Sequence, residues 1–204
     1  MENQDLFHNN SEDTGLNENK GSQQIICLGK IFNSEEERRD YFRNQLQHKL
    51  PELKKLEGFP IGEDEDIINL SDPPYYTACP NPWLNDFIAE WELEKKSEII
   101  CDFKVKEPYA NDISVGKNNP IYNAHGYHTK VPHPAIMRYI LHYTQPGDIV
   151  LDGFAGTGMT GVAGLLCENP DSETKFIIET EWREMFNSSP RWGLRHTILE
   201  DLSP

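Results

Sequence analysis

Apolar residues recur at helical spacing in several stretches of the chain. In residues 34–50 they fall on one side of a helix, made up of Tyr41, Phe42, Leu46 and Leu50. Ser34 with Glu37 three residues later forms a capping box, which predicts that the helix begins there. Pro51 is expected to begin a second helical turn. The same periodicity predicts helices over residues 83–95, 134–143 and 160–166.

Short apolar runs predict strands. Residues 67–70 and 149–152 each form a run that suits a buried strand, and residues 196–199 suggest another strand. Residues 101–127 are rich in Asn, Pro and Gly and predict a long loop, which in a compact domain is usually functional. Residues 153–161 form a glycine-rich turn. The polar stretch that contains Trp182 and Trp192 carries no predicted element.

Composition divides the chain into two parts. Residues 1–23 are polar and acidic, and predict a disordered tail, whereas residues 24–204 have the apolar content of a folded domain. The chain has no run of 18 apolar residues and no apolar stretch at its start, so we expect a cytoplasmic protein without a membrane span.

Charge and cysteine spacing exclude other classes of site. The net charge of -15 is unfavourable for binding nucleic acid, because phosphate contacts require Lys and Arg. Four scattered cysteines fit neither a disulfide framework nor paired zinc ligands. His125, His128 and His133 cluster, but no cysteine or carboxylate stands among them at ligand spacing, so no metal is expected.

A strand, a glycine turn and a helix form the first candidate site. Asp152 ends the predicted strand, and Gly156, Gly158 and Gly161 follow at the spacing of a nucleotide-binding turn. Glycines allow the backbone to approach a ligand closely, and the helix that follows directs its N–H groups toward that ligand. The spacing alone is shared by nicotinamide, flavin and methyl-donor enzymes.

Asp72-Pro73-Pro74-Tyr75 forms the second candidate site. The prolines stiffen the backbone and leave carbonyl groups free to accept hydrogen bonds. A carboxylate, a carbonyl and an aromatic ring suit a flat heterocycle that carries an amine. The alternative is a surface Pro-Pro turn with a packing tyrosine.

These two segments together resemble the amino-methylating DNA methyltransferases. Asp72-Pro73-Pro74-Tyr75 is similar to their catalytic signature, and residues 152–160 resemble their methyl-donor loop, with Gly153 in place of the usual proline and Met159 in place of the usual threonine. The catalytic motif precedes the donor loop, as in the permuted β-type members. The matched segments cover about a quarter to a third of the chain.

The resemblance implies a fold, a cofactor and a substrate. We expect an α/β chain with a partial Rossmann-like methyltransferase fold and an incomplete sheet, and a catalytic domain over residues 24–204 with a donor-binding half at 128–204. It implies S-adenosylmethionine as cofactor and double-stranded DNA with a flipped base as partner. It also implies a restriction–modification or phage-defence setting. Aspartate at position 72 favours adenine-N6 over cytosine-N4.

The resemblance also assigns site residues. Asp72 and the Pro73 carbonyl would accept the amine hydrogens, and Tyr75 would stack on the base; Tyr76, Asn81 and Trp83 are candidate walls of the base pocket. The methyl donor would be held by Asp152, Phe154, Gly156, Thr157, Gly158, Thr160, Thr129, Lys130 and Asp201. Glu200 competes with Asp201 for the ribose hydroxyls. Transfer would be direct, so Cys79 is not needed as a nucleophile.

Several alternatives remain at this stage. A complete enzyme of this kind needs more sheet than 204 residues hold, so we expect an N-terminal portion or a truncated member, with the main DNA-binding surface elsewhere. An inactive remnant is one rival. A dinucleotide-dependent oxidoreductase is another, with Glu179 or Glu181 as its ribose-binding acid. Methylation of RNA or protein is a third.

Overall fold

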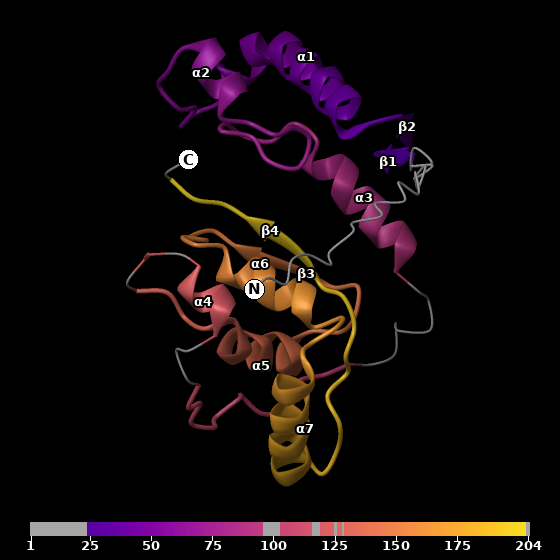
Figure 1. The fold of residues 1–204 in the computed structure, drawn as a ribbon, viewed down its shortest axis with the longest axis vertical. Helices are drawn as coiled ribbons and strands as arrows, with labels where there is room; N and C mark the ends of the chain where they lie inside the picture. The colour runs from indigo at the N-terminus through magenta and orange to yellow at the C-terminus, as the bar shows by residue number, and fades with distance from the viewer. Residues whose placement is uncertain (1–23, 96–102, 116–118, 125, 128, 203–204) are drawn as a thin grey trace, which may run out of the picture.

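The computed structural model describes residues 24–95, 103–115, 119–124, 126–127 and 129–202 (Figure 1). The predicted disordered tail at residues 1–23 lies outside the described residues, as do His125 and His128. The fold is mixed α/β, with a two-stranded sheet in each half of the described chain. None of the described helices is long and apolar enough to cross a membrane.

The N-terminal elements form a hairpin packed on a long helix. Strand β1 (Ile25–Cys27) pairs antiparallel with β2 (Lys30–Phe32). The two-residue turn between them has positive φ at Leu28 (48°) and Gly29 (70°), the backbone that a tight hairpin needs. Phe32 is buried against Phe42 of the helix that follows.

Helix α1 (Glu35–Leu53) confirms the predicted cap, because the Ser34 hydroxyl accepts a hydrogen bond from the Glu37 N–H at 3.1 Å. The predicted apolar side is largely confirmed, with Tyr41 half-buried and Arg38 buried on the same side. The prediction for Pro51 is wrong, since it lies inside α1. It stands in the last turn, and beyond it the helical hydrogen bonds continue from the Lys54 N–H to the Leu50 carbonyl at 2.9 Å.

The predicted strand at residues 67–70 is wrong. Residues Asp64–Asn69 form a short helix, α2, with only Ile67 buried. Its first turn holds Asp64, Glu65 and Asp66, and acidic side chains there are stabilised by the positive end of the helix dipole. No neighbouring strand is available to this run in the described residues, so local helical preference prevails.

Helix α3 (Leu84–Glu94) links the two halves and confirms the prediction for residues 83–95. Beyond it lie α4 (Pro120–Asn123), a single turn within the predicted loop, and α5 (His133–Tyr143), which was predicted. In Figure 1, α3 runs from the N-terminal elements down to the group formed by α4–α7, β3 and β4.

The C-terminal half is built on two parallel strands. Strand β3 (Ile149–Asp152) pairs in parallel with β4 (His196–Leu199), and α6 (Met159–Leu166) and α7 (Ser172–Phe186) connect them. Both strands were predicted. Strand β3 is less buried than expected, with Leu151 66% exposed.

Helix α7 is absent from the sequence prediction. It is capped by Asp171, whose carboxylate accepts from the Thr174 N–H at 2.9 Å, and it buries Ile178 and Trp182 four residues apart. These contacts place α7 in the larger core cluster together with residues of α5 and α6. The aspartate cap and the four-residue apolar spacing were present in the sequence as a signal for this helix.

Candidate functional site

The catalytic-type motif is held in a closed loop between α2 and α3. The backbone groups of Asp72 and Tyr76 exchange two hydrogen bonds, at 3.0 and 3.1 Å, and the peptide between Pro73 and Pro74 is cis. Because α2 replaces the expected strand, the motif does not stand at the end of a strand. The loop is shaped by its own hydrogen bonds.

Two polar side chains next to the motif complete the loop. The buried Ser71 hydroxyl donates to the Ile67 carbonyl at 2.6 Å and accepts from the Ala78 N–H at 2.9 Å. The Asn81 amide donates to the Pro74 carbonyl at 2.8 Å. Asn81 was expected to line a base pocket. In the structure it fixes the backbone that presents the motif, while Tyr76 is 45% exposed.

Arginines of α1 surround the acid of the motif. Asp72 accepts from Arg38 Nη2 at 3.1 Å and from Arg39 Nε at 3.0 Å, and the Pro73 carbonyl accepts from Arg38 Nη1 at 2.7 Å. Burial raises the pKa of Asp72, but the hydrogen bonds and charges of the two arginines outweigh it and hold the pKa below its usual range. Arg38 was not predicted as a site residue. The sequence indicated only that it lies on the apolar side of α1.

Tyr75 is about half exposed, and its ring is held between two neighbours. The ring lies 4.7 Å from the Arg38 guanidinium carbon and 5.9 Å from the Phe87 ring centroid. Burial of the hydroxyl, together with the nearby Cys27 thiol, raises the pKa of Tyr75 to about 12.

A row of four aromatic rings joins this loop to the other half. Tyr75 stacks on Phe87, Phe87 stacks on Trp91 at 5.7 Å, and Trp91 stacks on His196 at 4.6 Å. We call Tyr75, Phe87, Trp91 and His196 the aromatic row. Trp91 thus forms part of the contact between the halves.

The aromatic row sets the direction of α3 relative to the parallel strands. Trp91 meets His196 at the start of β4, and Lys95 pairs with Asp148 at 2.7 Å, just before β3. The C-terminal end of α3 therefore lies at the beginning of both strands, and α3 and β4 run in opposite directions in Figure 1. The 72–76 loop, at the other end of α3, lies toward the carboxyl ends of the strands, where the glycine turn begins.

The glycine turn is shaped by Asp152. Its carboxylate accepts from the Phe154 N–H at 3.0 Å and from the Thr160 hydroxyl at 2.6 Å. Asp152 and Thr160, which were both assigned to the donor site, thus help to fix the conformation of the turn. Phe154 is 84% exposed, and Thr157 follows it in the same turn, ahead of α6. No hydrogen bond or ring contact joins residues 72–76 directly to residues 152–160 within the described part of the chain.

The glycines of this turn serve two purposes. Gly156 (φ 53°) and Gly158 (φ 70°) adopt a left-handed backbone, and a Cβ at Gly156 would meet no atom within 4 Å, so the turn is open above it. At Gly161 a Cβ would lie 2.7 Å from Leu199, so that glycine permits α6 to pack on β4. The turn therefore leaves its backbone open above Gly156, where a ligand has room to approach.

The acidic pair after β4 folds onto the same turn. The Gly156 N–H donates to the Asp201 carboxylate at 2.7 Å, and the Ala155 N–H donates to the Glu200 carbonyl at 2.9 Å. The structure thus brings Asp201 to the glycine turn, and its assignment to the ribose hydroxyls stays a prediction. Glu179 and Glu181, the acids that an oxidoreductase would use, lie on α7 and bond Trp192 and Arg138 instead, which counts against that rival.

The remaining donor-site predictions lie near the start of α5. Thr129 is exposed, and the Lys130 ammonium donates to the Tyr127 carbonyl at 3.1 Å and lies 4.4 Å from the Tyr122 ring centroid. Among the described residues there is no group of three His, Cys, Asp or Glu side chains that could hold a metal ion.

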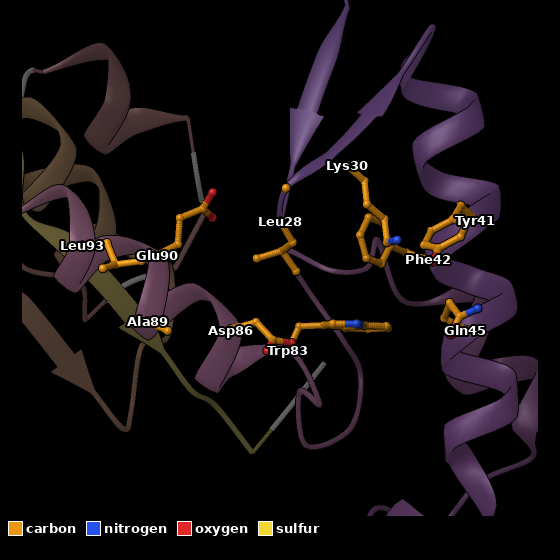
Figure 2. A pocket seen from close by; sticks show the side chains of 11 residues that line it. Leu28, Lys30, Tyr41, Phe42, Gln45, Trp83, Asp86, Ala89, Glu90 and Leu93 are labelled. Carbon is orange, nitrogen blue, oxygen red and sulfur yellow. The ribbon is translucent and has the colours of Figure 1, made fainter.

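A cavity of about 480 Å³ lies between the hairpin, α1 and α3, and Figure 2 shows its lining. Trp83 lines it together with Tyr41 and Phe42, whereas the sequence assigned Trp83 to the wall of a base pocket beside the 72–75 motif. None of the residues 72–76 or 152–160 lines this cavity. It is therefore separate from the two motifs.

Comparison with known proteins gives one match. A family model described as DNA methylase matches residues 30–169, a span that includes both the 72–75 motif and the glycine turn. No curated protein and no solved structure matches the chain. Because the family model covers more than half of the chain and both motifs, the chain belongs to the amino-methylating DNA methylase family.

Proposed function

We propose that this chain transfers a methyl group from S-adenosylmethionine to an exocyclic base amine in DNA, at adenine-N6 rather than cytosine-N4. The observation that carries the proposal is the pair of hydrogen-bond acceptors at Asp72 and Pro73. They lie at the N-terminal end of α3, which is directed toward the carboxyl ends of β3 and β4. The parallel β3–β4 pair with its helical connection supports a Rossmann-like arrangement with an incomplete sheet.

The protein's residues act by orienting the amine. The Asp72 carboxylate and the Pro73 carbonyl accept its two N–H groups, which directs the nitrogen lone pair away from the ring plane. The Tyr75 ring, held against Phe87, would stack on the flipped base. Asp72, whose pKa the two arginines lower, stays ionised and accepts the hydrogen bond, and the proton that the methylated amine then loses would pass to water.

The glycine turn and the acid after β4 would hold the donor. The open backbone at Gly156 and the N-terminus of α6 would receive the methionine part, and Asp201 or Glu200 the ribose. S-adenosylmethionine supplies an electrophilic methyl group when bound. The family resemblance also leads us to propose a restriction–modification or phage-defence setting in the cytoplasm, with the main DNA-binding surface outside these residues.

The test is methyl transfer from isotopically labelled donor to adenine-containing DNA, with nucleosides analysed by mass spectrometry. The wild-type chain should yield labelled N6-methyldeoxyadenosine, and Asp72→Ala should reduce the yield by at least about a hundredfold, since one amine hydrogen loses its charged acceptor. Label on deoxycytidine would correct the base. Absence of label from wild type would favour an inactive remnant.

A further inference from the structure

The guanidinium group of Arg38 lies within the catalytic motif itself. Its side chain is 2% exposed, and its two terminal nitrogens donate to the Asp72 carboxylate at 3.1 Å and to the Pro73 carbonyl at 2.7 Å. Its central carbon lies 4.7 Å from the Tyr75 ring centroid. One side chain therefore engages the three groups that the proposed function assigns to the target base.

Guanidinium and a base amine have closely similar recognition chemistry. Guanidinium is flat, offers N–H donors in its plane and stacks on aromatic rings. The amine of adenine offers two N–H donors in the plane of a flat ring, so both groups satisfy a pair of fixed acceptors beside an aromatic face. We propose that Arg38 occupies the place of the target amine until a base enters, and must withdraw for the reaction. This inference rests on the proposed function.

The surrounding charges permit that withdrawal. Arg38 Nε donates to the Glu35 carboxylate at 2.6 Å, and the Glu35 side chain is 59% exposed. The guanidinium therefore keeps an ionic partner at the surface when its terminal nitrogens leave the motif. Arg38 thus lowers the fraction of molecules that are competent to bind a base. The apparent affinity for the base is the intrinsic affinity multiplied by that fraction.

The test compares nucleoside binding by the 204-residue chain and its variants, measured by ligand-observed NMR. The probes are 2′-deoxyadenosine and purine 2′-deoxyriboside, which lacks the amine. Arg38→Met keeps the aliphatic stem without the donors, and should bind deoxyadenosine at least about tenfold more tightly than wild type. Arg39→Met is the matched control, because it removes one arginine from Asp72 but leaves Pro73 and Tyr75 as they are. It should change binding by less than about threefold.

Two further measurements keep the inference falsifiable. In Arg38→Met, millimolar guanidinium chloride should compete with deoxyadenosine for the vacated place. If Arg38→Met does not fold, as judged by circular dichroism, Arg38→Lys decides, since it keeps the charge but not the planar fork, and tighter binding of deoxyadenosine is still expected.

The outcomes separate the two claims. Deoxyadenosine affinity equal to or below that of wild type in the folded variant overturns the inference, because Arg38 then supports the motif instead of filling it. The proposed function is judged by a different ratio. If neither wild type nor any variant binds deoxyadenosine more tightly than purine deoxyriboside, the motif is not an amine-binding site. The proposed function and the proposed role of Arg38 then both fail.

Discussion

Asp72 carries its charge inside an ionic cluster with Arg38 and Arg39, and that cluster links the candidate site to stability. The folded-state pKa of Asp72 lies below its ordinary value, so the unfolded chain takes up a proton at higher pH than the folded chain does. The stabilising contribution is present above about pH 4 and is lost as the pH falls through the lower folded pKa.

Urea unfolding between pH 3 and pH 7 measures this contribution as a free energy of unfolding at each pH. The free energy of unfolding of wild type should fall on acidification below about pH 4 more steeply than that of Asp72→Asn, which has no proton to take up. Equal pH dependence in the two proteins would show that Asp72 is not held ionised by the arginines.

At the scale of single residues, sequence reasoning located the motifs but not their surroundings. Asp72, Pro73 and Tyr75 could be found because their order along the chain is itself the signal. Arg38 could not be assigned, because it stands 34 residues before Asp72 and depends on α1 packing over the loop. Contacts of that sequence separation arise only from tertiary structure.

At the scale of elements, α6 packs closely on β4. A Cβ at Gly164 would lie 2.6 Å from the Thr197 methyl carbon and 3.3 Å from the Arg195 carbonyl oxygen. The second of these is backbone and cannot rotate away. The glycines of α6 therefore bring the helix close to β4, which ends two residues before Asp201.

Gly164→Ala should lower the free energy of unfolding by about 1–3 kcal/mol, the usual cost of overpacking, although alanine favours helix. Gly153→Ala is the matched control, because a Cβ there meets nothing within 4 Å, and it should change stability by less than about 0.5 kcal/mol. Urea titration at neutral pH measures both. Equal stability of the two variants would contradict the close packing of α6 on β4.

Helices and turns were predicted correctly where capping residues and apolar periodicity indicated the same element. The prediction failed where the element depended on a packing partner elsewhere in the chain. The Ser34 cap, the α3 and α5 periodicities and the glycine turn each specified their element. Residues 67–70 carried the apolar run of a strand, yet the acids before them favour the first turn of a helix and no partner strand is present in the described residues. Local sequence cannot reveal whether a partner strand exists.

At the scale of the whole molecule, α3 holds the two halves together. Trp91 stacks on His196 at 4.6 Å, with the rings 10° from parallel, and Lys95 pairs with Asp148. The orientation of the catalytic-type loop toward the glycine turn depends on these contacts. Sequence alone gave both motifs and their order, but it could not give this orientation.

Trp91→Ala should separate the unfolding of the halves. We expect a loss of about 1–3 kcal/mol and a thermal transition that broadens or splits, since stacking and apolar burial between the halves are both removed. Leu93→Ala, on the same helix but 87% exposed, should leave the transition unchanged. Identical calorimetric traces for the two variants would mean that the aromatic row does not couple the halves.

The proposed methyl transfer requires residues 72–75 and residues 152–160 to face one shared space. The most direct measurement is calorimetric binding of a bisubstrate compound that joins the N6 atom of deoxyadenosine to the methyl-donating position of an S-adenosylmethionine analogue. We expect it to bind at least about a hundredfold more tightly than either half, because the second half binds at high effective concentration. Both Asp72→Ala and Gly156→Val should abolish that gain. Binding no tighter than the donor half alone would contradict a common site.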